Sequence, residues 1–426
     1  MKLYWSEVAL TKRVLVISQH FYPEIGSAGN RIKNIYKLLK DENYDVNVLT
    51  TEPTYPNKKI YHDEQFWDDE SIDEENDVTR IGVKNRKYSR SIINRLMYYL
   101  EIAFKMMLFI LTDRKQYDVV FVTSPPIFIA VVGLLAKYRY RRPLILDIRD
   151  LWPESLKGVG VFNYPVVISV FSRLEKILYV KADHIIVNSE GFIRFMTEKY
   201  TIPLNKIHFM PNAANRNEIS MIESGSDVFK VMYAGNIGLA QDVTVLMDLA
   251  KELHEYNIEL TVMGYGFKKK EFVRFTKEHK LTNVRFIKPT TRQECLHIIS
   301  EHHIGIVTLN GKQVFETVLP GKIIDYMTCG IPIVASVSGY AKDVIVSHEA
   351  GIVSETNTAD EMLRHILYLY QHPSKRSEMS RNSLNYVKKH FFWEKNIEVL
   401  IRLIENKSSE PLHVEQTESV DKVEVL

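Results

Sequence analysis

Short runs of apolar, mostly β-branched residues recur along the chain, separated by segments with helical spacing. The runs do not alternate apolar with polar residues, which is typical of a parallel sheet covered on both faces. After the first run, Ile32, Ile35, Tyr36 and Leu39 repeat at the spacing of one helix face. Strands and helices in alternation predict βαβ units and an α/β fold. The predicted strands span residues 13–18, 45–51, 118–124, 143–148, 184–189, 229–236, 258–264, 283–288, 304–309 and 331–336.

The strand pattern restarts near residue 229, after a polar segment at 215–227 that we interpret as an interdomain linker. The chain has 426 residues, enough for two domains of about 200 residues, each with its own core. We therefore predict two doubly wound, Rossmann-like domains, at residues 1–213 and 228–390, which face each other across a central cleft.

The last part of the chain divides into an amphipathic segment and a polar one. A helix at residues 391–405 is predicted to close the fold, and the tail at 406–426 is expected to be disordered. In the first domain, the acidic stretch 63–77 is interpreted as a solvated surface loop, with a functional role as the alternative.

Charge and cysteine content exclude several classes of protein. Lys and Arg number 55 against 53 for Asp and Glu, so the balance argues against a dedicated nucleic-acid binder. Cys295 and Cys329 stand apart from each other and from any metal-ligand spacing. They are typical of small buried hydrophobic residues in a reducing compartment.

Two apolar stretches of the first domain bear on membrane contact. Residues 95–115 are strongly apolar but include Glu101 and Lys105, and residues 126–136 number only 11 where about 20 are needed to span a bilayer. Neither predicts a transmembrane helix. Together with the basic segment 137–143 they could dock on an anionic leaflet, and core helices beside a solvated basic turn are the alternative.

Two glycine-rich turns follow predicted strands, one in each domain. In the first, Gly26 precedes a helix expected to begin near Gly29 or Asn30, and in the second, Gly235 and Asn236 end a strand. Small residues let backbone N–H groups approach an anion, and a helix N-terminus adds a favourable dipole. The first turn matches neither a Walker nor a G-x-G-x-x-G fingerprint, so taken alone it could be an ordinary βα turn. Two of them facing one cleft fit a diphosphate held from both sides.

The stretch DIRDLWPESL places Arg149 and Asp150 directly after a predicted strand. Because ligand sites of α/β proteins lie at the carboxyl ends of strands, we expect this loop to face the substrate. The alternative is a structural salt bridge between Arg149 and a carboxylate, with Trp152 in the core. Asn212 also follows a predicted strand and is expected at the domain junction.

The segment VFETVLPGKIIDYMTCGIPIVAS gathers charge around a helix predicted at residues 323–328. Lys322 at the loop–helix junction can neutralise a phosphate, while Glu316 and Asp325 can accept hydrogen bonds from sugar or ribose hydroxyls. The alternative is a surface Glu–Lys pair and an acidic residue at a helix start, worth under about 1 kcal/mol. Backbone N–H groups that could donate to the phosphate are those of Thr317, Val318 and Leu319.

Together these motifs resemble the family 4 retaining glycosyltransferases of the GT-B fold. The resemblance is greatest to the bacterial subgroup that builds surface polysaccharides, such as the L-fucosamine transferases. The motifs occur in family order over residues 13 to 400. They are HFYPEIGSAGNRI, TTEPTYPN, VTSPPIFIA, LDIRDLWPESL, ADHIIVNSEGF, MPNAAN, YAGNIGLAQD and FETVLPGKIIDYMTCGIPIVAS.

The resemblance implies a UDP-sugar donor held by the C-terminal domain and an acceptor, polyprenyl-linked or glycan, held by the N-terminal domain. By position, Asp325 stands where the second glutamate of the family's E-x7-E element contacts the donor ribose. The first glutamate would fall at Thr317, whereas the carboxylate here is Glu316, one place earlier. Lys322 fits the Pro-x-Lys variant of the subgroup.

Many relatives also carry an Arg and a Lys after the glycine of YAGNIGLAQD, where this chain has Asn236 and Gln241. Positive charge opposite the diphosphate is therefore expected to rest on Lys322. The resemblance implies transfer with retention, with a leaving diphosphate that deprotonates the acceptor hydroxyl and with no protein nucleophile. Asp150 is expected to orient the acceptor or handle its proton.

The predicted catalytic residues are thus Asp150, Lys322 and Glu316. The residues predicted to bind the donor are Gly26, Asn212, Gly235, Asn236, Thr317, Val318, Leu319, Lys322 and Asp325. We expect no metal, because no Asp-x-Asp motif follows a strand, and no cofactor besides the donor substrate. The expected location is cytoplasmic, at the inner face of the cell membrane.

The sugar is expected to be an N-acetylated hexosamine or a deoxyhexosamine. Two other functions are compatible with the same fold, a UDP-sugar 2-epimerase and a nucleotide-sugar sensor without activity. An epimerase needs acidic and histidine groups for elimination at the sugar ring, and His20 is the candidate histidine in a loop predicted to face the donor.

Overall fold

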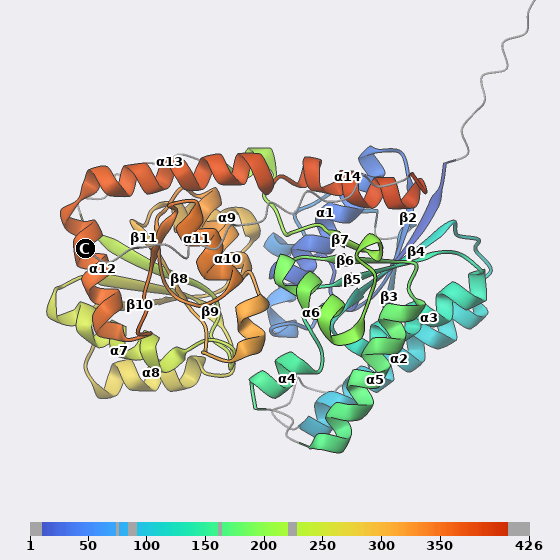
Figure 1. Cartoon of the computed structure of the whole chain (residues 1–426), viewed down its shortest axis with the longest axis horizontal. Helices are drawn as coiled ribbons and strands as arrows, with labels where there is room; N and C mark the ends of the chain where they lie inside the picture. The colour runs from blue at the N-terminus through green and yellow to red at the C-terminus, as the bar shows by residue number, and fades with distance from the viewer. Residues whose placement is uncertain (1–10, 74–75, 84–91, 161–163, 220–227, 408–426) are drawn as a thin grey trace, which may run out of the picture.

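Two parallel sheets form the centres of two domains that lie side by side (Figure 1). The computed structural model describes residues 11–73, 76–83, 92–160, 164–219 and 228–407. The first sheet has seven strands in the order β3-β2-β1-β4-β5-β6-β7, and the second has six in the order β10-β9-β8-β11-β12-β13. Both contain the 3-2-1-4-5-6 order of a doubly wound fold. The prediction of two Rossmann-like α/β domains is confirmed.

Every predicted strand is present, with ends within two residues of the prediction. In the first domain these are β1 (Arg13–Ile17), β2 (Asp45–Thr51), β4 (Val119–Ser124), β5 (Leu144–Ile148) and β6 (His184–Val187). In the second they are β8 (Lys230–Asn236), β9 (Glu259–Tyr265), β10 (Val284–Ile287), β11 (Ile304–Thr308) and β12 (Ile333–Ser336). Three short edge strands were not among the predictions: β3 (Val78–Ile81), β7 (Ile207–Phe209) and β13 (Gly351–Val353).

Helices cover both sheets. In the first domain they are α1 (Ser27–Asp41), α2 (Ile92–Thr112), α3 (Ile127–Tyr140), α4 (Glu154–Gly158), α5 (Pro165–Lys181) and α6 (Glu190–Tyr200). In the second they are α7 (Val243–Glu255), α8 (Lys269–Glu278), α9 (Arg292–Ser300), α10 (Gly321–Thr328), α11 (Tyr340–Ser347), α12 (Ala359–Gln371) and α13 (Pro373–His390). Burial on both faces explains the unbroken apolar strands: all six residues of β4 are buried.

Helix α1 begins at Ser27, earlier than the predicted start near Gly29 or Asn30. The carbonyl of Gly26 already accepts the N–H of Asn30 at 3.0 Å, so the first helical turn includes the small residues that were expected to form the loop. Gly26 itself has a φ of 112°, which favours glycine. Helix α10 likewise begins at Gly321, two residues before its predicted start.

The last helix, α14 (Trp393–Ile404), lies within the predicted closing segment and packs on α1 of the first domain. Helices α13 and α14 follow each other along one side of the molecule, α13 over the second domain and α14 over the first (Figure 1). The chain therefore passes from the first domain to the second and then returns. The expected disordered tail lies outside the described residues from residue 408 onward.

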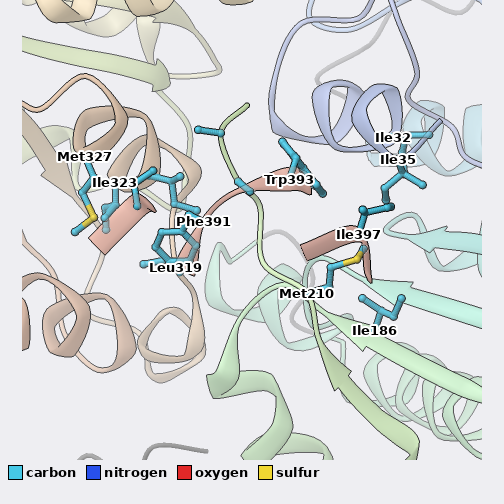
Figure 2. Packing of buried hydrophobic residues seen from close by; sticks show 14 of the residues in the cluster. Ile32, Ile35, Ile186, Met210, Leu319, Ile323, Met327, Phe391, Trp393 and Ile397 are labelled. Atoms are coloured by element: carbon cyan, nitrogen blue, oxygen red, sulfur yellow. The ribbon is translucent and has the colours of Figure 1, made fainter. Parts of the chain in front are cut away.

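The two crossings run side by side. Ala214 pairs with Phe392 as a parallel bridge, in which the N–H of Ala214 donates to Phe391 O at 2.7 Å and the N–H of Trp393 donates to Ala214 O at 3.1 Å. Buried residues around this bridge form one apolar cluster that includes parts of both domains. In Figure 2, Trp393 and Ile397 lie toward Ile32 and Ile35 of α1, while Phe391 lies toward α10.

Candidate functional site

A cavity of about 970 Å³ lies between the domains, lined by residues from the strand ends and helix starts of both. Its walls contain most residues predicted to form the site: Gly26, Asp150, Asn212, Gly235, Asn236, Val318, Leu319, Lys322 and Asp325. This volume falls within the roughly 300–1,000 Å³ that is usual for cavities that bind small molecules.

The N-termini of two helices converge on this cavity, one from each domain. A Cβ atom placed on Gly321, at the start of α10, would lie 3.5 Å from the Cβ of Ser27, at the start of α1. Free N–H groups and the positive end of the helix dipole make such termini favourable for anions. An anion between the two domains would therefore meet both helix starts.

Lys322 lies at the same place and carries a positive charge there when it is protonated. Its Nζ is buried and has no hydrogen-bond partner among the described residues, and it lies 3.8 Å from the centre of the Tyr233 ring. Burial lowers the pKa of the Lys322 ammonium to about 7, while the Asp325 carboxylate opposes that shift. A buried amine without a hydrogen-bonding counter-ion is costly, and an anionic ligand would remove that cost.

Tyr326, one turn after Lys322, fixes α10 on the sheet. Its hydroxyl accepts the N–H of Ala234 at 2.8 Å. The ring needs the space beside Gly305, where a Cβ atom would lie 2.4 Å from the Tyr326 ring. Gly305 on β11 and Ala234 on β8 thus set the position of the helix that carries Lys322 and Asp325.

Asp325 lies in the cavity wall and is held by Arg292 at the start of α9. The Asp325 Oδ1 accepts a hydrogen bond from Arg292 Nη1 at 2.5 Å. Arg292 also binds Glu218, with Nε to Oε1 at 3.1 Å and Nη2 to Oε2 at 3.2 Å. Burial raises the pKa of Asp325, and the neighbouring guanidinium counteracts that rise. All three side chains line the cavity.

The first-domain wall contains Arg149 and Asp150, as expected of the loop after β5. Arg149 donates to Thr123 Oγ1 at 2.6 Å and to the carbonyl of Pro125 at 2.7 Å. Burial lowers the pKa of Arg149 to about 10 and raises that of Asp150 to about 6. A carboxyl group with that pKa can bind or release a proton near neutral pH.

The buried ion pair beside this loop joins Asp147 of β5 to Arg31 of α1. Asp147 accepts three hydrogen bonds from Arg31, at 3.2, 3.1 and 2.7 Å, and both side chains are fully buried. Arg31 Nη1 also donates to Asn212 Oδ1 at 3.3 Å. Asn212 itself lines the cavity between the domains, as predicted, and its amide oxygen accepts this hydrogen bond from a core arginine.

Glu316 and Thr317 are absent from the cavity wall. Glu316 is exposed, and its backbone packs against Gly339 at the start of α11. The carbonyl of Thr317 accepts the Ser189 hydroxyl at 2.5 Å, which ties this turn to the first domain. The N–H of Val318 already donates to Phe315 O at 3.3 Å. The geometry thus supports Lys322 and Asp325 more than the preceding turn, which forms the 3-10 helix η5 (Gln313–Thr317).

Two further sequence interpretations change. The acidic stretch is not merely solvated, since its Phe66, Asp68 and Asp69 line the cavity, and Asp69 pairs with Lys33 of α1 at 2.8 Å. His20 lies in the first domain, pairs with Glu24 at 2.5 Å and is absent from the cavity wall. The histidine in the wall is His297 of α9.

Sequence reasoning missed Arg292, Glu218 and Arg31. Asp325 is 33 residues from Arg292, which is 74 from Glu218, and Arg31 is 116 from Asp147. No local pattern marks partners at such separations, and Arg292 has no distinctive neighbours. The strand-end position of the loop before α9 is the one signal that could have drawn attention to it.

The fold and the cavity place the chain in the GT-B class, in which two Rossmann-like domains face a shared cavity. Residues 26–213 match the family described as Glycosyl transferase 4-like domain, and residues 215–386 match the family described as Glycosyl transferases group 1. The chain therefore belongs to the glycosyltransferases, and each domain matches one of these two families.

Individual proteins resemble the chain over nearly its whole length. An uncharacterized glycosyltransferase of Methanocaldococcus jannaschii is 22% identical over 413 residues, 92% of this chain and 98% of that protein. The structure of sucrose-phosphate synthase from Thermosynechococcus elongatus has a TM-score of 0.71 at 14% identity, over 93% of this chain and 98% of that one.

Two further structures have the same fold. Anabaena HepE, solved in complex with UDP-glucose, has a TM-score of 0.66 at 13% identity, over 92% of this chain and 99% of that one. WaaG, a glycosyltransferase involved in lipopolysaccharide biosynthesis, has a TM-score of 0.62 at 12% identity, over the same shares of the two chains. At these identities the likeness establishes the fold alone.

Proposed function

We propose that the chain is a retaining, metal-independent glycosyltransferase of bacterial surface-polysaccharide synthesis. It moves an N-acetylated hexosamine or a deoxyhexosamine from a UDP-sugar to a polyprenyl-linked or glycan acceptor. The observation that carries the proposal is the buried Lys322 ammonium at a helix start in the cavity wall, which has no hydrogen-bonding partner among the described residues. HepE with its UDP-glucose and WaaG with its lipopolysaccharide role support the donor and the pathway class.

In this proposal the donor diphosphate lies in the cavity beside the adjoining starts of α1 and α10, with Lys322 as its cation. As the bond to the sugar breaks, negative charge grows on the diphosphate, and the ammonium and N–H groups stabilise it. The leaving phosphate oxygen takes the proton of the acceptor hydroxyl on the same face of the sugar. Asp150, in the opposite wall, orients that hydroxyl.

A thermal-shift screen with UDP-, GDP- and dTDP-sugars tests the donor, with wild type and Lys322→Ala side by side. We expect UDP-sugars to raise the melting temperature of the wild type and to lose most of that effect in the variant. An equal shift in both proteins would contradict the role of Lys322. Mass spectrometry of the same mixtures with a polyprenyl-diphosphate sugar distinguishes transfer from epimerisation, which needs no acceptor.

We also propose that the enzyme works at the cytoplasmic face of the membrane, bound to it through α2 and α5. The inner face of α2 is buried at Tyr98, Ile102, Met106 and Ile110, yet its outer face is also apolar. Exposed residues there include Phe104, at 62%, and they recur at helical spacing: Met97, Leu100, Phe104, Leu108 and Leu111. Monomeric soluble proteins seldom expose such continuous stripes.

Helix α5 carries a second exposed apolar stripe, and exposed basic residues lie nearby. The stripe consists of Val166, Val170, Ile177 and Val180. Arg139, Arg141 and Arg142 are exposed at the end of α3, which packs against both helices. Apolar stripes beside positive charge fit an anionic bilayer surface. No helix of the described residues is long and apolar enough to cross the membrane.

Flotation with vesicles of phosphatidylglycerol tests this surface. We expect the double variant Phe104→Glu/Leu108→Glu to lose vesicle binding, because two carboxylates would replace apolar contacts. Val346→Glu is the matched control, since Val346 is an exposed apolar residue of α11 in the other domain. Equal flotation of both variants and the wild type would contradict the proposed surface.

A further inference from the structure

Arg292 holds two carboxylates of the cavity at once. It binds Glu218 with two parallel hydrogen bonds, from Nε at 3.1 Å and from Nη2 at 3.2 Å, and binds Asp325 with Nη1. The side chains of Arg292 and Asp325 are 27% and 26% exposed, and that of Glu218 is 13% exposed. A planar guanidinium that is fixed on one side by a bidentate carboxylate presents its remaining N–H group in a defined direction.

Asp325 is bound through one of its two oxygens. Arg292 occupies Oδ1, and within the described part of the chain no hydrogen bond is recorded to Oδ2. Because Asp325 lines the cavity and is partly exposed, Oδ2 remains open to a ligand hydroxyl. The arginine thus fixes the carboxylate without filling its capacity to accept hydrogen bonds.

The charges around Asp325 explain why it needs this support. Glu218 is a second negative charge at the same guanidinium, and Lys322 lies one turn before Asp325 on α10. Without Arg292, two partly buried carboxylates would lie close together with no guanidinium between them. Like charges in a partly buried site disfavour the charged form of both groups.

Glu218 connects this arrangement to the crossing between the domains. It ends the 3-10 helix η4 (Arg216–Glu218), and its Oε2 accepts the N–H of Asn215 at 3.1 Å. Asn215 follows Ala214, whose backbone pairs with Phe392 at the second crossing. A single arginine therefore joins the cavity carboxylate to the segment that sets how the domains meet.

We propose, taking the UDP-linked donor of the proposed function as given, that Arg292 and Glu218 are positioning residues for the donor ribose. Glu218 fixes Arg292 at the domain crossing, and Arg292 orients Asp325 so that Oδ2 accepts the ribose hydroxyls. Neither residue touches the reacting atoms, so loss of either weakens donor binding more than it slows the turnover of bound donor.

Calorimetric titration with UDP and with 2′,3′-dideoxy-UDP tests this role. For the wild type, we expect removal of the two hydroxyls to weaken binding about 10- to 100-fold, since hydrogen bonds to a charged acceptor are strong. For Arg292→Met, we expect UDP to bind about 10- to 100-fold more weakly and the two ligands to differ by less than about threefold. Arg292→Lys should recover part of the discrimination, because an ammonium keeps the charge without the fork.

Two more variants complete the design. Arg285→Met is the matched control, because Arg285 is an exposed arginine on β10 whose loss should leave both affinities unchanged. Glu218→Gln keeps the shape and removes the charge that fixes Arg292, so it should reduce the discrimination less than Arg292→Met does. Circular dichroism would reveal whether Arg292→Met fails to fold. In that case Glu218→Gln still tests the positioning role, with Arg285→Met as its control.

The results separate this role from a purely structural one. If Arg292→Met or Glu218→Gln weakens UDP and 2′,3′-dideoxy-UDP by equal factors and keeps the full discrimination, the positioning role is overturned. If the wild type binds UDP but does not distinguish the two ligands, the ribose contact of Asp325 is overturned while UDP binding stands. A wild type that binds neither ligand would overturn the proposed function and the positioning role together.

Discussion

Two arginine–aspartate pairs lie near the domain junction, and they differ in access to the cavity. Arg31 and Asp147 are joined by three hydrogen bonds and are fully buried in the first domain. Arg292 and Asp325 are joined by one and keep about a quarter of their surface exposed in the second. In the first pair the arginine binds both carboxylate oxygens, whereas the second leaves one carboxylate oxygen open to a ligand.

Each pair also includes a residue from near the domain crossing. Asn212 accepts a hydrogen bond from Arg31, and Glu218 accepts two from Arg292. The same chemistry therefore serves the fold on one side and a candidate binding site on the other. Residue type alone does not separate the two uses; accessibility from the cavity does.

Breaking the fully buried pair of Arg31 and Asp147 should have the largest effect on stability. Arg31→Met leaves Asp147 buried without its guanidinium, so we expect the free energy of unfolding to fall by about 3–5 kcal/mol. Urea denaturation followed by circular dichroism measures the change. The control is Arg274→Met, which removes an exposed pair with Glu278 at 3.6 Å and should cost less than about 1 kcal/mol. Similar losses of unfolding free energy in both variants would show that the buried pair matters no more to stability than an exposed one.

Lys322→Met should have the next largest effect, which we expect on donor binding. We expect UDP to bind about 30- to 1,000-fold more weakly, since the ammonium is the cation of the candidate phosphate site. Calorimetric titration measures the affinity. A loss of UDP affinity smaller than threefold would contradict the role of Lys322 as the cation of the diphosphate.

The titration of Lys322 gives this prediction a pH dependence. Its pKa is about 7 in the folded, unliganded protein and 10.5 in its ordinary state, so the unfolded chain binds more protons between these values. Stability of the unliganded wild type should therefore rise relative to Lys322→Met as the pH increases from 7 to 10.5. At pH 8, UDP binding should take up as much as one proton, measured by calorimetry in two buffers of different ionisation enthalpy.

Asp325→Asn tests whether the carboxylate of the partly exposed pair serves ligand binding or the fold. We expect about 10- to 100-fold weaker UDP binding, because an amide replaces a charged acceptor, and a change in stability well below that of Arg31→Met. Titration and urea denaturation of the same preparations give both numbers. A loss of stability equal to that of Arg31→Met would mean that Asp325 serves the fold as Asp147 does.

Tyr326→Phe should have the smallest effect. It removes the hydroxyl that accepts the Ala234 N–H at 2.8 Å and leaves that buried donor unpaired, which costs about 1–3 kcal/mol. Donor affinity should fall by less than in Lys322→Met, because α10 shifts without losing its charges. Unchanged stability would show that β8 does not hold α10 through this hydroxyl.

The fold could be predicted from the sequence because buried parallel strands have a strong local signature. The strands that were not predicted are short and lie at sheet edges: β3, β7 and β13 have four, three and three residues. Val78–Ile81 includes Arg80, and Gly351–Val353 begins with glycine, so neither resembles an apolar run. Sheet pairing, more than composition, makes these segments strands.

The candidate site could be predicted where its residues belong to a local motif at a strand end or a helix start. Lys322 and Asp325 share a loop–helix junction and were found together. Glu316, which the sequence places one residue before the position of the family's first glutamate, is exposed, because the η5 turn directs its backbone to Gly339. Arg292 and Glu218 come from other elements, and only the folded sheet brings them beside Asp325.

The paired crossings at Ala214 and Phe392 have a consequence for anyone who recombines such enzymes. Because α14 returns to pack on α1, the half that contains the first sheet is built from two pieces of chain (Figure 1). A chimera that takes its donor half from a relative should therefore be joined at both crossings, near residues 214 and 391. A single junction near 214 would graft a foreign α14 onto the native α1 and mismatch the surfaces that hold the halves together.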